Sequence, residues 1–557
     1  MTLTAPPANR TTPPPGHAFV PAPGSGAELR AFARLQETLA PMYRRVFPYL
    51  DAPRTVVVIP SMSLDPEELT KLVGASYYEE RFLCLLLLLQ LPATDVVYVT
   101  SEPVAPAIVE YYLGLLRGVD MADARSRLTM LACHDASASP LSEKILARPA
   151  LLARIRELVR DPAAAHLTCF TATALERTLA VRLNLPLYGC DPALGHLGTK
   201  SGSRDVFRLA GVPMPPGYEH LRGEEDLIRA LANLKRDYPG LRRAVIKLEE
   251  GFSGEGNAIF SYDGAPGGRA LEPWVRRELP VRAAFVAAGE TWENYRQAFA
   301  RMGGIVEAFI DGGEKRSPSV QCRIDPLGAT QIISTHDQVL GGSTGQVYLG
   351  CTFPAEASCC PGLHAAAQRV TEVLAADGVV ARFGIDFVSV RAPNAPGGWD
   401  HFAIEINLRK GGTTHPYLAL QLLTDGRYDA TTGRFHTAAG TPCCYVASDN
   451  LCDPAFASLT PSLVISAADR CGLAFNRATS SGVVFHLLGA LSEFGKLGAV
   501  CIAPTHERAH ELFAEVVAML HREGGRVDGS HDSVRADLGP TAGGRILPDA
   551  SSWPSPP

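Results

Sequence analysis

Four short runs of apolar, mostly β-branched residues constrain the fold of this chain more than any other feature. They span residues 55–60, 95–101, 128–132 and 166–170. Each run is almost continuously apolar rather than alternating, which is typical of strands buried on both faces of a parallel sheet. Segments with helical spacing separate the runs, so the sequence predicts a doubly wound α/β domain that ends near residue 187.

The helical segments are expected at residues 77–91, 103–117, 149–160 and 173–183, after a first helical stretch at 28–50. The most apolar stretch, residues 82–91 (FLCLLLLLQL), has about half the length that a membrane-spanning helix needs. We therefore expect a buried helix there. No GxGxxG motif follows the first apolar run, which argues against a dinucleotide site in this domain.

The length of 557 residues is enough for three or four folding units, taking about 100–200 residues for each. Seven prolines precede Gly24, and the last segment is rich in Gly, Ser and Pro, so both ends are expected to be disordered. The sequence predicts an α/β and α+β multidomain protein. Its expected parts are a lead-in at 1–27, the α/β domain at 28–194, a second domain at 195–429, a small C-terminal module at 430–522 and a tail at 523–557.

Charge and cysteine content narrow the functional class. Lys and Arg number 52 against 58 Asp and Glu, a formal net charge of −6, whereas dedicated nucleic-acid binders usually carry a basic surface. The thirteen cysteines include no CxxC pair and are expected to be reduced thiols, which indicates the cytoplasm. We therefore expect a cytoplasmic protein that acts on small molecules, with neither nucleic acid nor a membrane as its partner.

A lysine and a glycine-rich loop form the first chemical motif, at residues 244–257 (AVIKLEEGFSGEGN). Lys247 ends an apolar strand, and the following loop contains three glycines and a serine. Glycines let backbone N–H groups approach phosphate oxygens, and the lysine supplies a positive charge. The motif is not a Walker A sequence, because no Gly-Lys-Ser/Thr follows. The alternative is a glycine-rich hairpin with a surface lysine.

The second motif, residues 306–314 (VEAFIDGGE), is a strand that runs into a turn with acidic residues at both ends. Such a segment could present backbone groups to an adenine and a carboxylate to ribose hydroxyls. The alternative is an edge strand with a solvated turn.

The third motif combines Asp386 with Glu405, Asn407 and Arg409. Glu405 and Asn407 are two residues apart, so on a strand they share one face, and Arg409 follows in the same spacing. Acidic groups beside buried strand residues are costly unless they are paired or bind a metal, and Mg²⁺ prefers such oxygen ligands. The alternative is a structural salt bridge between Arg409 and Glu405. The fourth motif is Lys200, which precedes a helix predicted to end at Gly211 and is unremarkable alone.

Taken in order, these four motifs resemble the ATP-grasp superfamily of carboxylate–amine ligases. The resemblance covers residues from about 195 to 424, and the preceding α/β domain resembles the domain that usually precedes the ATP-grasp domain in that family. It implies binding of ATP with Mg²⁺, with two ions expected and Mn²⁺ able to replace them. The implied contacts are Lys200, Lys247, Gly251, Ser253, Gly254 and Gly256 for the phosphates, Glu307, Ala308 and Ile310 for adenine, Glu314 for ribose, and Asp386, Glu405 and Asn407 for the metal.

The resemblance also implies the catalytic groups. Arg409 completes an E-x-N-x-R pattern in which the arginine faces the acyl phosphate or the substrate carboxylate, and the backbone N–H groups of Gly411 and Gly412 could hold an oxyanion. His336 and His415 are candidate proton acceptors, although a structural role is favoured for each.

A narrower resemblance, to the pheganomycin-type peptide ligases, rests on residues 335–342, 407–416 and 482–486 (GVVFH). It implies an ADP-forming ligase that joins an amino acid-like carboxylate to the amine of an amino acid or peptide through an acyl phosphate, in natural-product (antibiotic) biosynthesis. A homodimer is left open. The alternatives are a carboxylase of the biotin carboxylase type and a non-catalytic ATP-binding protein on the same fold.

Overall fold

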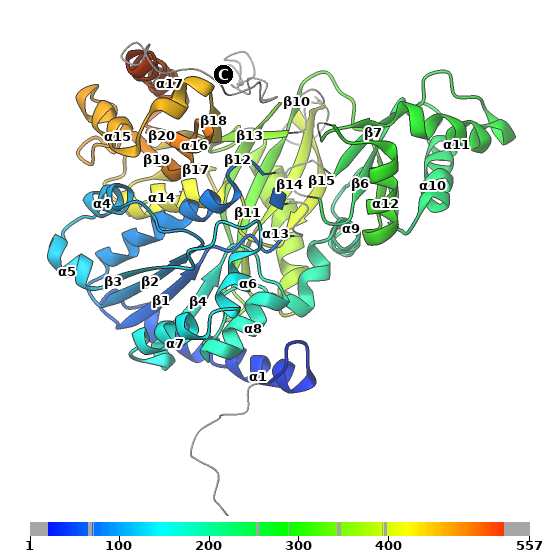
Figure 1. Ribbon diagram of the computed structural model, residues 1–557. Helices are drawn as coiled ribbons and strands as arrows, with labels where there is room; N and C mark the ends of the chain where they lie inside the picture. Colours follow the sequence, from blue (N-terminus) through cyan, green and yellow to red (C-terminus); the bar gives the residue numbers. More distant parts are fainter. Residues whose placement is uncertain are drawn as a thin grey trace, which may run out of the picture.

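The computed structural model describes residues 21–64, 69–70, 72–251, 256–287, 289–341, 347–392, 394 and 398–528. Figure 1 shows the N-terminal α/β part in blue and a small sheet with α10, α11 and α12 projecting on the opposite side in green. A large central sheet lies between them, and the C-terminal segments, in orange and red, lie above the N-terminal part.

The N-terminal part contains the predicted parallel sheet. Its strands pair in the order β3-β2-β1-β4, and every pair is parallel, as the continuous apolar runs predict. The strands are β1 (Arg54–Ile59), β2 (Thr94–Thr100), β3 (Leu128–Ala132) and β4 (Ala165–Cys169). The helices of this part are α1 (Gly26–Gln36), α2 (Leu39–Val46), α4 (Pro106–Gly114), α5 (Met121–Ser126), α6 (Leu141–Leu146), α7 (Pro149–Leu158) and α8 (Ala174–Leu183), with short 3₁₀ turns η2 (Pro162–Ala164) and η3 (Pro192–Gly198).

The leucine-rich stretch is helical and buried, but it forms a 3₁₀ helix, η1 (Ala75–Gln90), rather than an α-helix. Leu83, Leu86 and Leu89 are completely buried. η1 packs against both β2 and α14 (Thr414–Thr424), so it joins the N-terminal part to the large central sheet. An apolar run predicts burial, whereas it does not determine whether the hydrogen bonds span three or four residues.

The small sheet is antiparallel and has the order β5-β9-β6-β7-β8. Its strands are β5 (Gly217–Leu221), β6 (Arg243–Leu248), β7 (Asn257–Ser261), β8 (Ala284–Phe285) and β9 (Gly304–Ala308). It packs with α10 (Glu224–Asp237), α11 (Leu271–Arg282), α12 (Trp292–Met302) and the short η4 (Gly268–Ala270). This sheet carries the first two motifs, since Lys247 lies on β6 and Glu307 on the adjacent β9.

The large sheet has nine strands in the described chain. Eight of them follow the order β10-β14-β11-β12-β13-β18-β20-β19, and the ninth, β15, also pairs with β14. These strands are β10 (Lys315–Arg316), β11 (Pro318–Ile324), β12 (Thr330–Gly341), β13 (Val347–Phe353), β14 (Ala381–Arg391), β15 (Trp399–Asn407), β18 (Cys444–Cys452), β19 (Gly482–His486) and β20 (Lys496–Ala503). Its helices include α9 (Lys200–Leu209), α13 (Cys360–Ala376) and α14, and a two-stranded ribbon, β16 (Arg427–Asp429) with β17 (Arg434–His436), follows α14.

The strands of the predicted C-terminal module join this sheet edge to edge. β13 pairs directly with β18, and β18 continues to β20 and β19. The helical elements of this segment are η6 (Pro454–Ser458), α15 (Pro461–Arg470), η7 (Leu488–Ala490), α16 (Leu491–Phe494) and α17 (His506–Asp528). The predicted boundary at residue 430 therefore cuts through a continuous sheet.

Both predicted ends need correction. α1 begins at Gly26, capped by Ser25, so helical structure starts inside the expected lead-in. α17 continues through Asp528, so the expected tail at 523 begins six residues too early. The remainder of both segments, residues 1–20 and 529–557, lies outside the described residues.

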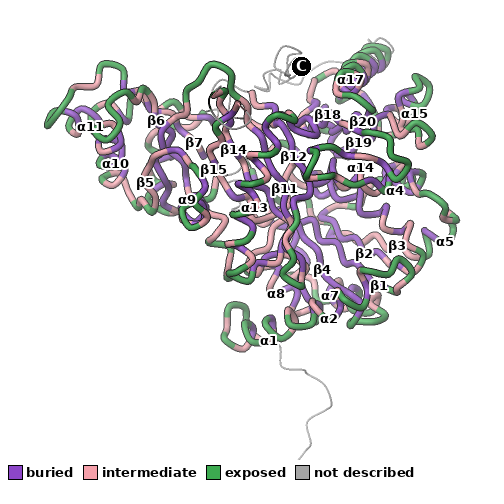
Figure 2. The backbone as a smooth tube through the Cα atoms, turned by 180° about the vertical axis from the view of Figure 1, so that it is seen from behind, coloured by how far each residue is buried: buried purple, intermediate pink, exposed green. Residues whose placement is uncertain are grey.

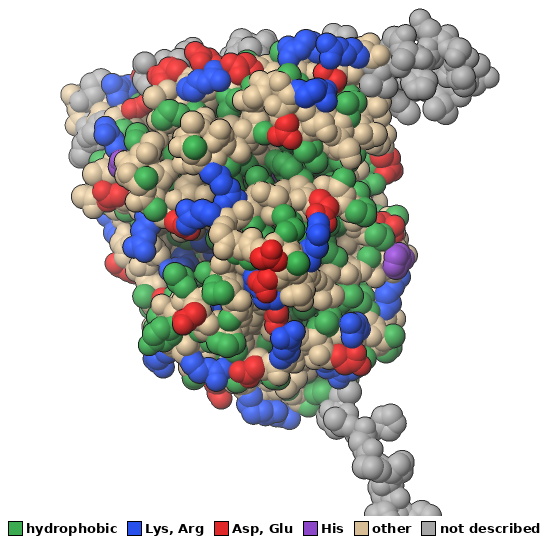
Figure 3. All heavy atoms as spheres, turned by 90° about the vertical axis from the view of Figure 1, so that its left-hand side faces the viewer, with side chains coloured by type: hydrophobic (Ala, Val, Ile, Leu, Met, Phe, Trp, Pro, Cys, Tyr) green, Lys and Arg blue, Asp and Glu red, His purple; other side chains and the backbone are tan. Residues whose placement is uncertain are grey.

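Burial is concentrated in the strands, as the purple segments of the tube in Figure 2 show. On the face seen in Figure 3, Lys and Arg side chains alternate with Asp and Glu, without a large region of one sign. Among the described residues, no helix combines the length and apolar character required to cross a bilayer.

Candidate active site

One cavity of about 650 Å³ lies where the three parts of the chain meet, and it contains most of the predicted site residues. Its lining includes residues of the small sheet, of β14 and β15, of η1 and of the C-terminal strands. The predicted site residues that line it are Lys200, Lys247, Gly251, Glu307, Ala308, Ile310, Asp386, Glu405, Asn407, Arg409, Gly411 and Gly412.

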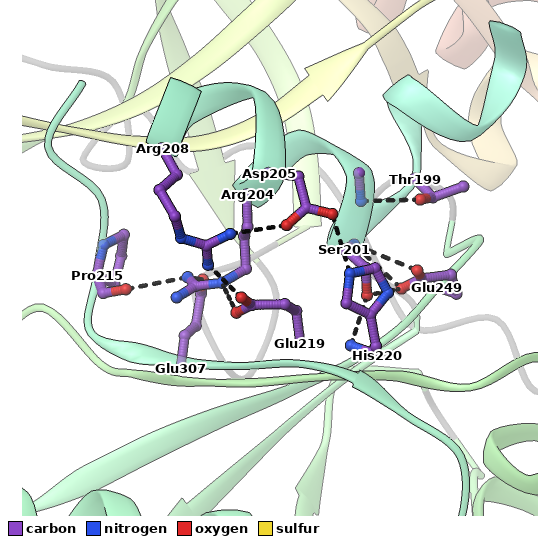
Figure 4. A network of polar contacts seen from close by, with 11 residues as sticks. Thr199, Ser201, Arg204, Asp205, Arg208, Pro215, Glu219, His220, Glu249 and Glu307 are labelled. Atoms are coloured by element: carbon purple, nitrogen blue, oxygen red, sulfur yellow. Dashed lines mark hydrogen bonds and ion pairs between the residues drawn. The ribbon is translucent and has the colours of Figure 1, made fainter. Parts of the chain in front are cut away.

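Lys200 is held at the start of α9 by its neighbours in the sequence. Thr199 caps the helix, its Oγ1 accepting from the backbone N–H of Gly202 at 3.1 Å, and the Ser201 hydroxyl donates to Glu249 at 3.1 Å (Figure 4). A Cβ at Gly202 would lie 1.9 Å from the carbonyl oxygen of His196, so only glycine allows α9 to approach η3 this closely. The Lys200 ammonium lies 2.5 Å from Oε1 of Glu405.

Lys247 is also paired with a buried carboxylate. Its ammonium lies 2.5 Å from Oε1 of Glu307, and Nη1 of Arg204 lies 3.4 Å from Oε2 of the same residue. Arg204 also donates to Glu219 at 3.0 Å and to the carbonyl of Pro215 at 3.0 Å, so that α9, β5 and β9 are tied together (Figure 4). The Glu307 side chain therefore positions two cations. For this reason, we expect adenine to contact the backbone of residues 307–310 and not this side chain.

The glycine-rich loop closes at its base through two glycines. A Cβ on Gly256 would lie 3.0 Å from Cα of Gly251, so the two backbones approach as only glycines allow. Gly251 lines the cavity next to Lys247. The predicted phosphate contacts Ser253 and Gly254 lie outside the described residues.

The three predicted metal ligands come together through the pairing of β14 with β15. Asp386 lies opposite Glu405, and Asn407 lies opposite Gly384. The Asp386 carboxylate accepts from Nε2 of Gln338 at 3.0 Å and from Nδ2 of Asn407 at 2.9 Å. Asn407 thereby keeps its carbonyl oxygen available for a cation.

The electrostatics of this group suit a divalent cation. Burial, reinforced by the charge of Glu405, raises the pKa of Asp386 to about 6. Burial alone would also raise the pKa of Glu405, but the nearby charge of Lys200 lowers it below its usual value. Two carboxylates and an amide oxygen on adjacent buried strands form the hard oxygen donor set that Mg²⁺ prefers, so the residues fit the predicted metal.

The segment after β15 places the predicted catalytic groups in the cavity. Burial lowers the pKa of Arg409, and its guanidinium lies 5.8 Å from the ring centre of Phe170. The N–H of Gly411 donates to Oγ1 of Thr414 at 2.9 Å, so an oxyanion at this N–H would have to replace the hydroxyl. For the N–H of Gly412, no acceptor is found in the described chain, so this N–H has no competing hydrogen bond there.

Two predicted residues are placed differently from expectation. Glu314 is not among the described residues that line the cavity; its half-exposed carboxylate lies 3.7 Å from Nε of Arg391, whereas the adjacent Lys315 does line it. His336 is completely buried and its Nε2 lies 2.7 Å from the hydroxyl of Tyr445, which supports the structural alternative for this histidine. Burial lowers the pKa of His336 to about 3.

The end of the cavity away from β6 and β9 is lined by residues outside the four motifs. Nη1 of Arg81, from η1, lies 3.2 Å from Oδ2 of Asp449, and Nζ of Lys496 donates to the hydroxyl of Tyr78 at 2.7 Å. Both cations contact the Tyr78 ring, at 4.6 and 4.8 Å from its centre. No local pattern marks them, because they lie in segments up to 418 residues apart.

Two family models match this chain. A model described as IQCH-like, ATP-grasp matches residues 192–263 and 281–430, and one described as the PGM1 C-terminal domain matches residues 464–516. The first contains all four motifs, and the second covers β19, β20 and the first half of α17.

Two curated proteins are similar over much of the chain. The L-propargylglycine–L-glutamate ligase of Streptantibioticus cattleyicolor is 31% identical over 483 residues, which cover 85% of this chain and 95% of the ligase. IQ motif-containing protein H of Danio rerio is 26% identical over 414 residues, 66% of this chain but only 38% of that protein.

Solved structures with a similar course of the chain have low sequence identity. An N5-carboxyaminoimidazole ribonucleotide synthetase in complex with ADP has a TM-score of 0.48 and 12% identity, covering 84% of this chain and 98% of its own. The biotin carboxylase domain of Hydrogenobacter thermophilus 2-oxoglutarate carboxylase, with MgADP and bicarbonate, has a TM-score of 0.49 and 14% identity, covering 86% and 95%.

Proposed function

This chain belongs to the ATP-grasp carboxylate–amine ligases of the pheganomycin type, and we propose that it forms an amide bond between an amino acid-like carboxylate and the amine of an amino acid or peptide. It is an ADP-forming ligase by membership of that family. The proposed route activates the carboxylate as an acyl phosphate and releases ADP and phosphate. The proposed setting is natural-product biosynthesis in the cytoplasm.

The observation that carries the proposal is the arrangement of charges in one cavity. Lys200, Lys247 and Arg409 are cations that line it together with the carboxylates Asp386 and Glu405. A buried group of this kind suits a polyphosphate bound with a divalent cation. When the present ion pairs open, phosphate oxygens would pair with the cations and the metal ion with the carboxylates. The chain as a whole, with a net charge of −6, supplies no general attraction for ATP.

We propose that ATP lies with its adenine against the backbone of residues 307–310 and its phosphates towards Lys200, Lys247 and the loop after Gly251. In this role Lys200 and Lys247 would exchange their carboxylate partners for phosphate oxygens. The loop would cover the phosphates and exclude water from the reactive intermediate. Asp386, Glu405 and Asn407 would hold Mg²⁺, which neutralises charge on the phosphates during transfer.

The substrate carboxylate would be oriented by Arg409. A carboxylate oxygen attacks the γ-phosphorus and ADP leaves, which gives a mixed anhydride. The amine nitrogen then attacks the acyl carbon, the carbon–oxygen bond to phosphate breaks, and the amine loses a proton. The N–H of Gly412 would stabilise the oxyanion of the tetrahedral intermediate.

The far end of the cavity is proposed to receive the charged groups of an amino acid or peptide. Arg81 and Lys496 are buried cations there, and Lys496 has a tyrosine hydroxyl as its hydrogen-bond partner. A buried cation is stabilised by an anionic partner, which a substrate carboxylate would provide. A peptide ligase, rather than a carboxylase that accepts bicarbonate, makes use of such an extended charged cavity.

The experiment that tests the function is a phosphate-release screen over pairs of amino acids and short peptides, with mass spectrometry of the products. The name of the Streptantibioticus relative provides the first pair to test, L-propargylglycine with L-glutamate. We expect phosphate and ADP only when a carboxylate and an amine substrate are both present, together with an amide product. Turnover that requires bicarbonate in place of an amino acid would contradict the proposal.

A further inference from the structure

Three buried side chains, His415, Asp449 and His486, meet beside the cavity and have no part in the proposed reaction. They come from α14, β18 and β19 and lie at least 34 positions apart along the chain. All three are at most 5% exposed, and Asp449 lines the cavity. Their convergence therefore depends on the union of the C-terminal strands with the central sheet.

The ligand atoms form a small triangle. Nε2 of His415 and Nε2 of His486 are 3.0 Å apart, and Oδ1 of Asp449 lies 3.0 Å from His486 and 3.3 Å from His415. An ion at about 2.0–2.1 Å from each of three such atoms holds them about 2.9–3.4 Å apart. The triangle already has the size of a metal-binding face.

Protons alone satisfy this triangle poorly. A neutral imidazole carries one N–H and one lone pair, and an ionised carboxylate has no proton to donate. Two neutral histidines can place at most two protons at this centre, whereas hydrogen bonds along all three edges of the triangle would need three. A central cation would satisfy all three atoms together. The buried Nδ1 atoms of both rings have no hydrogen-bond partner in the described structure, so each ring makes its polar contacts through Nε2.

The surroundings orient the carboxylate. Arg81 pairs with Oδ2 of Asp449 at 3.2 Å and leaves Oδ1 directed at the two histidines. Such an outer partner fixes a metal-ligating carboxylate in other proteins. The positive charge of Arg81 beside an added cation would be balanced by an anionic ligand entering from the cavity, such as hydroxide or a carboxylate.

We propose that His415, Asp449 and His486 bind one divalent first-row transition-metal ion of the zinc or iron(II) class, with a remaining coordination position towards the cavity. Two imidazoles and one carboxylate select such ions over Mg²⁺, which prefers oxygen ligands. The site is separate from Asp386, Glu405 and Asn407, and it does not depend on the proposed reaction.

The test measures metal rather than activity. Elemental analysis of the purified chain after incubation with Zn²⁺ and gel filtration should give about one equivalent, and Co²⁺ should give a visible absorption band typical of nitrogen ligation. His415→Gln and His486→Gln should each reduce both signals at least about tenfold. His166→Gln, a buried histidine outside the triangle, and Glu405→Gln should retain them.

Absence of a bound ion in the unsubstituted protein, or signals that survive both substitutions, would overturn the proposal. If the variants do not fold, X-ray absorption of the Zn²⁺-loaded parent replaces them. A first shell with two imidazole nitrogens supports the site, and a shell of oxygens only contradicts it.

Discussion

The ammonium of Lys200 lies 2.5 Å from Oε1 of Glu405, and both side chains are largely buried. The proposed phosphate-binding cation and the proposed metal ligand are thus each other's partner. Lys247 and Glu307 repeat the arrangement at the same distance. We expect each carboxylate to orient its lysine and then to give way to phosphate oxygens, which would avoid an unpaired buried charge.

Replacement of Glu405 should separate catalysis from folding. Glu405→Gln keeps the shape and a hydrogen-bond acceptor for Lys200 but removes the charge that a metal needs. We expect kcat for substrate-dependent ADP formation to fall at least about 100-fold, with an unchanged circular dichroism spectrum. Asp400→Asn, at an exposed position of the same strand, is the matched control. Normal turnover by Glu405→Gln would remove this residue from the metal site.

Arg409→Ala should retain nucleotide binding and lose ligation. The proposed role of the guanidinium is with the substrate carboxylate and the acyl phosphate, so calorimetric affinity for a non-hydrolysable ATP analogue with Mg²⁺ should change less than about threefold. Amide formation should fall by a factor that corresponds to about 3–4 kcal/mol of transition-state stabilisation. If Arg409→Ala forms product at the parent rate, the arginine has a structural role only.

Adjacent glycines should differ sharply in their tolerance of a methyl group. A Cβ on Gly412 would lie 2.9 Å from the ring of Tyr348, whereas one on Gly411 would meet no other atom of the described chain within 4 Å. We expect Gly412→Ala to lower kcat at least tenfold more than Gly411→Ala, because the first displaces the N–H proposed to bind the oxyanion. Equal rates for the two variants in the amide-formation assay would contradict this role of Gly412.

The contact between η1 and the C-terminal segment should weaken as pH rises. Burial raises the pKa of Glu80 to about 7, while its Oε2 accepts from the N–H of Gly489 at 3.0 Å. The protonated form is therefore favoured in the folded state. Its contribution to stability is complete below about pH 4.5 and is lost as pH rises through about 7.

Glu80→Gln mimics the protonated form, so its free energy of unfolding should equal that of the parent near pH 5 and exceed it by about 2–3 kcal/mol at pH 8. Chemical denaturation at both pH values measures the difference, with Glu37→Gln on the exposed surface as control. A difference that does not depend on pH would show that Glu80 is ionised throughout.

The sequence predicts those features of the fold and of the site that are set by residues close to one another along the chain. The continuous apolar runs predict the parallel order of β1 to β4, and the alternation around Glu405 predicts that Glu405 and Asn407 share a face with the cavity. Local spacing also identifies Lys200 and Lys247, because each lies at a defined end of a helix or strand.

The parts that were missed depend on contacts between distant segments. Nothing near β18 in the sequence indicates that it pairs with β13, so the sequence predicts the C-terminal module but not the sheet that it shares with the central part. Arg81, Asp449 and Lys496 reach the cavity only through that pairing and through the packing of η1. The hydrogen bond from Gly411 to Thr414 likewise depends on the turn before α14, which spacing alone does not specify.

Isotope transfer tests the central claim, activation of a carboxylate by the γ-phosphoryl group, most directly. A carboxylate substrate that supports turnover is labelled with ¹⁸O in both carboxylate oxygens and incubated with ATP, Mg²⁺ and the amine. The account predicts that the products are ADP and phosphate carrying one ¹⁸O atom, because the carboxylate oxygen that attacks phosphorus leaves with it. Unlabelled phosphate, or AMP with pyrophosphate, would contradict it.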